Sequence, residues 1–238
     1  MGLDVEKVAE AYVPFGSTDL KSYVQEIVDT RPDVILCSVV GDSAIAFFHE
    51  LRKAGISPDD IPVVMFAIAE DELRATDHTD MVGHYAAWNY FQSIDTDVNR
   101  KFVAAFKKRY GADRVTSDVI AAAYNSVYLW ANAVRESGNT DVQQVRNALR
   151  QQSLNAPEGI IAVDPSTQHT WRPVYIAKIQ QTGQFEIVWN SNGSVRPVPY
   201  PITRSKADWD AFVSDLYQSW GGWANTALTT PGRSTTSD

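Results

Sequence analysis

Residues 34–69, VILCSVVGDSAIAFFHELRKAGISPDDIPVVMFAIA, decide the fold of this chain. The runs 34–40 and 61–66 are continuously apolar, which is typical of strands buried on both faces. Between them, Ala, Phe and Leu recur at helical spacing until Gly55. A strand, a helix and a strand in this order predict a parallel βαβ unit with a right-handed crossover. Ligands of such sheets bind beyond the carboxyl ends of the strands, so residues 38–43 and 67–70 are the first candidates for a site.

A further strand is predicted upstream, in residues 8–14, VAEAYVP. The helix after it has apolar residues at 20, 23, 24, 27 and 28 and begins near Ser17, Thr18 or Asp19, which suit a cap. Asp42 or Ser43 is the expected cap of the next helix. Three strand–helix steps between residues 8 and 75 predict an α/β layer with a parallel sheet.

The middle of the chain is helical. After an aromatic, strand-like segment at 82–91, periodicity predicts three helices: one between Thr96 and Gly111, then 118–137 and 141–152. The helix at 118–137 is apolar on most sides and therefore needs cover on most sides. No strand lies among these three helices to provide that cover.

From residue 157 the pattern changes to short strands at 159–164, 172–179 and 185–189. Turn residues between them predict an antiparallel meander added to the α/β core. An amphipathic helix is expected at 207–220. Residues 226–238, rich in Thr and Ser, are predicted to be a disordered tail.

Composition limits the function. The 238 residues carry a formal net charge of −8, which argues against nucleic acid and anionic membranes as partners. Cys37 is the single cysteine, and its buried strand predicts an inert core thiol. No apolar run approaches the length of a spanning helix, and the first residues lack a secretory signal.

Motifs for catalysis are missing from the sequence. It has no phosphate-binding glycine loop, no nucleophile elbow and no histidines at metal-ligand spacing. Of the four histidines, His78 is expected in a solvated turn, and His84 is kept as a possible pocket residue. We therefore expect no cofactor, no metal and no enzyme activity.

Two acidic residues follow neighbouring predicted strands: Asp42 and Glu70. Either one can stabilise a helix start, because anionic side chains are favourable there by about 0.3–1 kcal/mol. Alternatively, both lie side by side at the carboxyl edge of the sheet and accept hydrogen bonds from a small polar ligand. Both interpretations stay open at this point.

This order of segments resembles the second half of type I periplasmic binding proteins, and most closely the urea and short-chain amide receptors of ABC importers and the related amide sensors. The resemblance covers about residues 8–215. It is carried by residues 12–19 (YVPFGSTD), 32–43 (PDVILCSVVGDS), 66–70 (FAIAE), 83–96 (GHYAAWNYFQSIDT), 156–159 (APEG) with Asp164, 168–171 (QHTW), 185–189 (FEIVW) and 196–200 (RPVPY).

The resemblance implies an α/β fold of two lobes joined by hinge crossings, with the ligand held between the lobes. This chain would supply a parallel βαβ lobe with added antiparallel strands and a helical block from an incomplete first lobe, whose strands would lie upstream of Met1. The implied division is 1–82 second-lobe core, 83–91 hinge crossing, 92–152 helices of the incomplete first lobe, 153–200 second-lobe antiparallel strands and hinge return, 201–225 C-terminal helical extension and 226–238 tail.

The resemblance also implies a ligand site. Its residues would be Val40, Asp42 and Ser43 after one strand, Ile68 and Glu70 after the next, and, from the hinge segment, Tyr85 and Trp88. Closure of the lobes would exclude water from a bound urea or short amide.

The leading hypothesis is a truncated solute receptor of an ABC importer, with a membrane permease as its partner. A homo-oligomer or another partner would cover the helices of 92–152. The alternative is a cytoplasmic amide sensor of the same fold, since a start at Met1 leaves no signal peptide; otherwise the family places the protein in the periplasm. A branched-chain amino acid receptor and a small enzyme using Asp42 and Glu70 rank lower.

Overall fold

A computed structural model describes residues 5–222, which divide into two compact units. The first unit comprises the residues up to 32, then 40–56 and the residues from 198 onward. The second comprises 33–39 and 57–197. Each unit is described by itself. The predicted tail at 226–238 lies outside the described residues.

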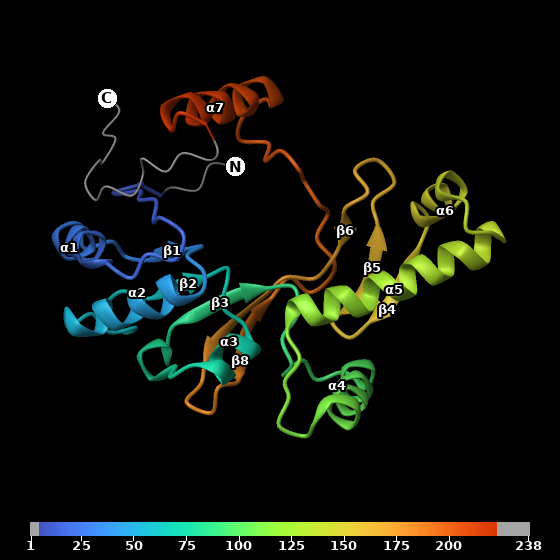
Figure 1. Cartoon of the computed structure of the whole chain (residues 1–238), viewed down its shortest axis with the longest axis horizontal. Helices are drawn as coiled ribbons and strands as arrows, with labels where there is room; N and C mark the ends of the chain where they lie inside the picture. The colour runs from blue at the N-terminus through green and yellow to red at the C-terminus, as the bar shows by residue number, and fades with distance from the viewer. Residues whose placement is uncertain (1–4, 223–238) are drawn as a thin grey trace. The chain divides into compact units, whose positions relative to one another are not determined.

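The first unit is helical, with α1 (Lys21–Thr30), α2 (Asp42–Lys53) and α7 (Lys206–Ser219) (Figure 1). α1 and α2 contact each other, and their stripes of Leu, Val and Phe are buried. The predicted caps are wrong, because the N-cap positions are Leu20 and Gly41, and neither helix start has a side-chain cap bond. Leu20 is completely buried, so apolar burial fixes the start of α1. Asp42 instead lies in the first turn of α2, where the helix dipole favours its charge.

The predicted strand at residues 8–14 is absent. The whole segment lacks regular structure, and Val8 and Tyr12 are half exposed. A strand forms only where its backbone finds a partner and its side chains bury apolar surface. Three of the central residues, Ala9, Glu10 and Ala11, offer little surface of this kind.

The second unit contains a five-stranded mixed sheet in the order β1-β2-β3-β7-β8. The first three strands are parallel, with Ile35 opposite Val63 and Val64 opposite Tyr85, as the βαβ prediction requires. β7 and β8 add to it as an antiparallel hairpin. The strands are β1 (Ile35–Cys37), β2 (Val63–Met65), β3 (Tyr85–Trp88), β7 (Tyr175–Ile179) and β8 (Phe185–Asn190).

Helices of the second unit follow the predicted pattern. They are α3 (Glu70–Ala75), the short 3-10 turn η1 (Thr79–Met81), α4 (Asp97–Tyr110), α5 (Asp118–Ser137) and α6 (Val142–Leu149). Thr96, the last residue of the stretch 93–96 that was expected to cap this helix, accepts a bond from the backbone N–H of Asn99 at the start of α4. Gly111 directly follows α4, as expected.

A second sheet was not predicted. Its three strands, in the order β4-β5-β6, are β4 (Ser153–Ala156), β5 (Gly159–Val163) and β6 (Thr170–Trp171). α5 packs against β4, and Leu129, Ala156, Ile161 and Val163 form the core between them. The expected single meander is therefore two structures: β5 and β6 belong to this sheet, and β7 and β8 to the larger one.

Three chain segments at the strand ends of the larger sheet are here called the crossing segments, and one of them, 172–174, joins the two sheets of the second unit. They are residues 89–92 after β3, 172–174 before β7 and 191–195 after β8. Asn89 Nδ2 donates to the Pro173 carbonyl at 2.7 Å. Ser191 exchanges hydrogen bonds with Val174, at 2.9 Å through its backbone N–H and at 3.0 Å through its hydroxyl. The crossing segments therefore lie side by side.

Candidate functional site

Glu70 is a buried carboxyl at the end of β2. It is the first residue of α3 and has no exposed surface. Its Oε1 accepts a 2.6 Å hydrogen bond from the backbone N–H of Gln92, while Oε2 has no partner among the described residues. Burial raises the pKa of Glu70 to about 8, against the opposing bond from Gln92. Near neutral pH, this carboxyl is therefore able both to donate and to accept a proton in a hydrogen bond.

Two other predicted residues belong to the same unit as Glu70. Trp88 Nε1 donates to the carbonyl of Ile68 at 2.7 Å, which fixes the indole at the carboxyl edge of β2 and β3. Ile68 lies two residues before Glu70 in the chain. A shared role of Ile68, Glu70 and Trp88 in a ligand site stays a prediction.

Tyr85 lies elsewhere on β3. It begins the strand and is an odd number of residues from Trp88, so its side chain points to the opposite face of the sheet. The Lys178 ammonium lies 6.0 Å from the centre of the Tyr85 ring. The role of Tyr85 in a ligand site therefore stays a prediction without geometric support.

The remaining predicted residues, Val40, Asp42 and Ser43, belong to the first unit. Val40 and Asp42 are exposed, and Ser43 is buried with a hydroxyl that has no partner among the described residues. The pairing of Asp42 with Glu70 would join the two units and stays a prediction.

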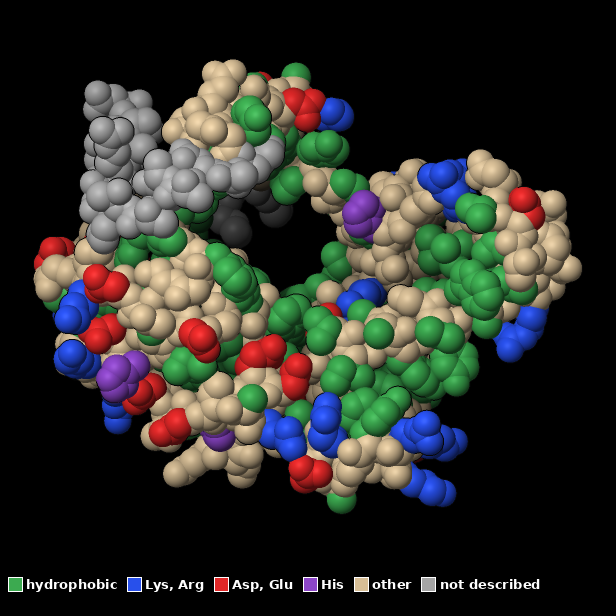
Figure 2. All heavy atoms as spheres, viewed as in Figure 1, with side chains coloured by type: hydrophobic (Ala, Val, Ile, Leu, Met, Phe, Trp, Pro, Cys, Tyr) green, Lys and Arg blue, Asp and Glu red, His purple; other side chains and the backbone are tan. Residues whose placement is uncertain are grey.

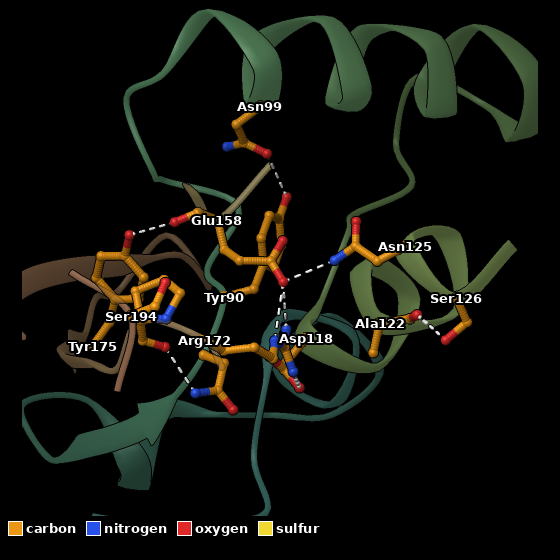
Figure 3. A network of polar contacts seen from close by, with 12 residues as sticks. Tyr90, Asn99, Asp118, Ala122, Asn125, Ser126, Glu158, Arg172, Tyr175 and Ser194 are labelled. Atoms are coloured by element: carbon orange, nitrogen blue, oxygen red, sulfur yellow. Dashed lines mark hydrogen bonds and ion pairs between the residues drawn. The ribbon is translucent and has the colours of Figure 1, made fainter. Parts of the chain in front are cut away.

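A buried network around Gln92 extends the polar surroundings of Glu70. The side-chain oxygen of Gln92, Oε1, accepts from the Thr116 backbone N–H at 2.9 Å. The Thr116 hydroxyl lies 2.7 Å from the Tyr90 hydroxyl, which donates to Asn99 Oδ1 at 2.8 Å (Figure 3). Burial raises the pKa of Tyr90, so its hydroxyl stays protonated. The sequence contains no signal that these four residues are hydrogen-bonded to one another.

A buried cluster of charged groups follows on the same side of the unit. The Arg172 guanidinium lies 2.8 Å from Asp118 and 2.9 Å from Glu158. Asn125 donates to the same Glu158 oxygen at 2.8 Å, and Tyr175 donates to the Glu158 carbonyl at 2.7 Å (Figure 3). Burial raises the pKa of Asp118, and the charge of Arg172 opposes this effect. These residues are far apart in the sequence, and only Glu158 belonged to a stretch that the sequence analysis singled out.

Asp164 organises the turn between β5 and β6. One of its oxygens accepts from the Ser166 hydroxyl at 2.6 Å and from the Thr167 backbone N–H at 2.9 Å, and the other accepts from Trp171 Nε1 at 3.1 Å. These bonds, that of Ser166 above all, hold the pKa of Asp164 well below its usual range. Both carboxylate oxygens thus accept hydrogen bonds from residues of the same turn, so Asp164 has a structural role there.

The histidines and the cysteine have structural partners. His84 is buried, and its Nδ1 accepts from the Val63 backbone N–H at 3.0 Å, so it joins two strands. His78 lies 3.0 Å from the Leu73 carbonyl, so the expected solvated turn is partly buried. Cys37 is buried as expected, and burial raises the pKa of its thiol.

An apolar groove of about 490 Å³ lies between α4 and α5. Its lining residues are Val98, Lys101, Phe102, Ala105, Phe106, Tyr110 and Tyr124. The ring of Tyr124 contacts those of Phe102 and Tyr128, each at a centroid distance below 5 Å. Figure 2 shows hydrophobic side chains gathered over this part of the unit. Large exposed apolar surfaces of this kind mark interaction sites.

The described residues contain no cluster of His, Cys, Asp and Glu that could hold a metal ion. Within residues 5–222, no helix is both long enough and apolar enough to cross a bilayer.

Comparison with known proteins decides the family. The model of the periplasmic binding protein domain matches residues 2–206. The chain belongs to this family. Its members are solute-binding receptors, and the mixed α/β architecture agrees with the type I fold that the sequence resembles.

Solved structures of solute-binding proteins share the fold. A solute-binding protein of R. palustris, in complex with 4-hydroxybenzoate, matches with a TM-score of 0.70 and 19% identity over 83% of this chain and 55% of that chain. An amino acid ABC transporter substrate-binding protein of Pseudomonas fluorescens matches with a TM-score of 0.70 and 17% identity over 82% and 52%.

Two curated relatives differ in how much they share. Leu/Ile/Val-binding protein homolog 6 of Brucella suis is 22% identical over 73% of this chain and 45% of that protein. Limonene hydroxylase of Geobacillus stearothermophilus is 38% identical over 117 residues, which are 49% of this chain and 21% of that protein. The chain thus spans between about a fifth and a half of the length of its relatives.

Proposed function

We propose that this chain is the ligand-binding second lobe of a solute receptor for an ABC importer, and that its ligand is urea or a short-chain amide. The observation that carries the proposal is the buried carboxyl of Glu70, one of whose oxygens has no hydrogen-bond partner among the described residues. A partly protonated carboxyl is able to donate to the carbonyl of an amide and to accept from its NH₂ group.

A second candidate is a receptor for an amino acid or an aromatic acid. It is supported by the similar proteins, one of which is in complex with 4-hydroxybenzoate, while two others are amino acid binding proteins. An ammonium group would pair with ionised Glu70, and a ligand carboxylate would need Glu70 protonated. The amide sensor remains an alternative within the same site chemistry.

The proposal includes a division of the chain. Residues 1–82 are the second-lobe core, 83–91 a hinge crossing, 92–152 helices of the first lobe, 153–200 second-lobe strands and the hinge return, and 201–225 an extension. The apolar groove between α4 and α5 supports this assignment, because helices of a complete lobe bury such a face against a sheet. A complementary lobe or a second copy would cover it, and a membrane permease would receive the ligand from the receptor in the periplasm.

Calorimetric titration with urea, acetamide, butyramide, leucine and 4-hydroxybenzoate tests the ligand. The protein is measured as this chain and as a longer version that carries the complementary lobe. At most about 1.5 kcal/mol per heavy atom is available, so the four heavy atoms of urea limit the dissociation constant to roughly 10–100 µM. Tighter binding of leucine or 4-hydroxybenzoate than of every amide would overturn the amide assignment.

Glu70→Gln identifies the site. We expect it to weaken amide binding about tenfold or more in the longer version. The glutamine Oε1 would keep accepting from Gln92, so the position of Glu70 Oε2 would carry an NH₂ group, which donates but cannot accept from the ligand. Asp59→Asn, at an exposed position of the same unit, is the matched control and should leave the affinity unchanged. Equal affinities of the two variants would remove Glu70 from the site.

A further inference from the structure

Arg172 joins the crossing segments of the second unit. Its carbonyl accepts a 2.8 Å hydrogen bond from the backbone N–H of Val195, so the segments before β7 and after β8 are paired there. Its guanidinium donates to Asp118 at 2.8 Å and, through Nε, to Glu158 at 3.0 Å. Figure 3 shows the three charged side chains meeting at one point beside the strands.

Asp118 extends this connection to the crossing segment after β3. The backbone of Asn89 faces the Asp118 carboxylate and lowers its pKa, and the Asn89 side chain donates to the Pro173 carbonyl at 2.7 Å. The crossing segment after β3 is therefore tied to the segment before β7. That segment is in turn paired with the one after β8 through Arg172 and Val195, so all three are connected.

The same segment leads to the candidate ligand site. Gln92, three residues after Asn89, donates its backbone N–H to Glu70 at 2.6 Å. A short piece of chain, residues 89–92, therefore has the buried charge cluster at one end and the Glu70 carboxyl at the other. A ligand that shifts Glu70 would act on this segment directly.

Breaking this buried cluster would leave charges unpaired, a cost that does not arise in an apolar core. Asp118 and Glu158 are buried with a single guanidinium between them, and Glu158 Oε2 and Asn125 Oδ1 have no partner among the described residues. Buried ion clusters contribute little net stability compared with apolar residues of similar size, but breaking one leaves uncompensated charge. The cluster therefore permits only arrangements that keep Arg172 between both carboxylates.

We propose that Asp118, Arg172 and Glu158 form a lock that holds the crossing segments in one arrangement and couples them to Glu70. This inference rests on the proposed function only in treating the crossing segments as a hinge. Its test needs no ligand, so failure of the lock and failure of the ligand assignment are distinguishable.

The lock is tested by measuring the distance between α6, which packs against α5, and β8 of the larger sheet. Spin labels are placed at Val142 on α6 and Val188 on β8, both exposed, in a Cys37→Ala background, and pulsed electron paramagnetic resonance gives the distance distribution. We expect one narrow distribution for the parent. The triple variant Asp118→Asn, Arg172→Met, Glu158→Gln should broaden it about twofold while the protein stays folded, because no unpaired charge remains.

An exposed cluster of the same composition provides the control. Arg100 pairs with Asp95 and Asp97 on the surface at the start of α4. Asp95→Asn, Asp97→Asn, Arg100→Met should leave the distribution as narrow as in the parent. A parent-like width in the buried variant, or equal broadening in both variants, would show that the buried cluster is no lock. Loss of folding in the buried variant would also overturn the proposal, since the cluster would then be a requirement of the fold.

Hydrogen exchange of the unmodified protein is a second measurement. The amides of Ser191 and Val195, both hydrogen-bonded between crossing segments, should exchange as slowly as those of β3. Exchange as fast as in residues 8–13, which lack regular structure, would contradict the lock.

Discussion

Glu70 is the residue whose chemistry departs furthest from its ordinary behaviour. Its pKa of about 8 in the folded protein lies above that in the unfolded chain, so the folded state holds its proton more tightly. Folding stability contributed by this group is then fully present below about pH 4.5 and is lost as the pH rises toward 8. We expect Glu70→Gln, which cannot ionise, to remove most of this decline between pH 5 and 8.

The measurement is the free energy of unfolding by urea at several pH values in this range. Urea is also a proposed ligand, so the series is repeated with guanidinium chloride. Asp59→Asn, at an exposed position, should keep the decline of the parent. A parent-like slope in Glu70→Gln would show that another group causes the pH dependence.

Single residues also mark the limit of what the sequence can predict. Glu70 was identifiable because it follows a recognisable strand, although its two interpretations could not be separated. The structure adds that the helix start is served by Glu72, which accepts from the Ala69 backbone N–H at 2.8 Å. Asp118, Glu158 and Arg172 could not be paired, because an ion pair over long sequence separation leaves no local pattern.

Among the elements, α4 and α5 offer a comparison of two helix starts. Thr96 accepts from the Asn99 backbone N–H at 3.1 Å, whereas the Ser117 hydroxyl is buried without a partner in the described part of the chain. Thr96→Ala should therefore reduce the free energy of unfolding by about 1 kcal/mol. Ser117→Ala should leave it unchanged or raise it, because a buried unsatisfied hydroxyl is removed.

Chemical denaturation of the two variants checks this difference. The same change at two N-cap positions controls for helix propensity, since alanine replaces the cap residue in both. A loss of equal size at Ser117 would mean that its hydroxyl has a partner, such as an ordered water.

Elements with local signals were predicted well. The helix at 118–137 and a cap within residues 93–96 were identified from periodicity and cap residues alone, and the structure assigns the cap to Thr96. β4 was missed because its alternation of exposed and more buried residues extends over only four residues, Ser153–Ala156. The strand at 8–14 was predicted from a similar weak pattern and is absent, which shows that short strands depend on partners that a local pattern cannot reveal.

For the whole molecule, the exposed apolar face of α5 is the main consequence of the fold. Val127 is 64% exposed and Trp130 51% exposed, three residues apart on one face of the helix. The sequence predicted helices without a sheet to cover them. The structure corrects this in part, because β4 and β5 cover one side of α5, whereas Val127 and Trp130 on another side stay exposed. Such a surface favours association unless another part of the receptor covers it.

We therefore expect this chain alone to associate at rising concentration, and Val127→Glu with Trp130→Glu to shift it toward the monomer in sedimentation velocity. Both side chains are exposed, so the melting temperature should change little. Val142→Glu with Val188→Glu, at equally exposed positions, should leave the association intact. Attaching the complementary lobe should abolish association without any substitution, because the lobe buries the same face. This face would not be the site of association if the chain stayed monomeric at every concentration. The same would follow if the control variant reduced association as much as the α5 variant.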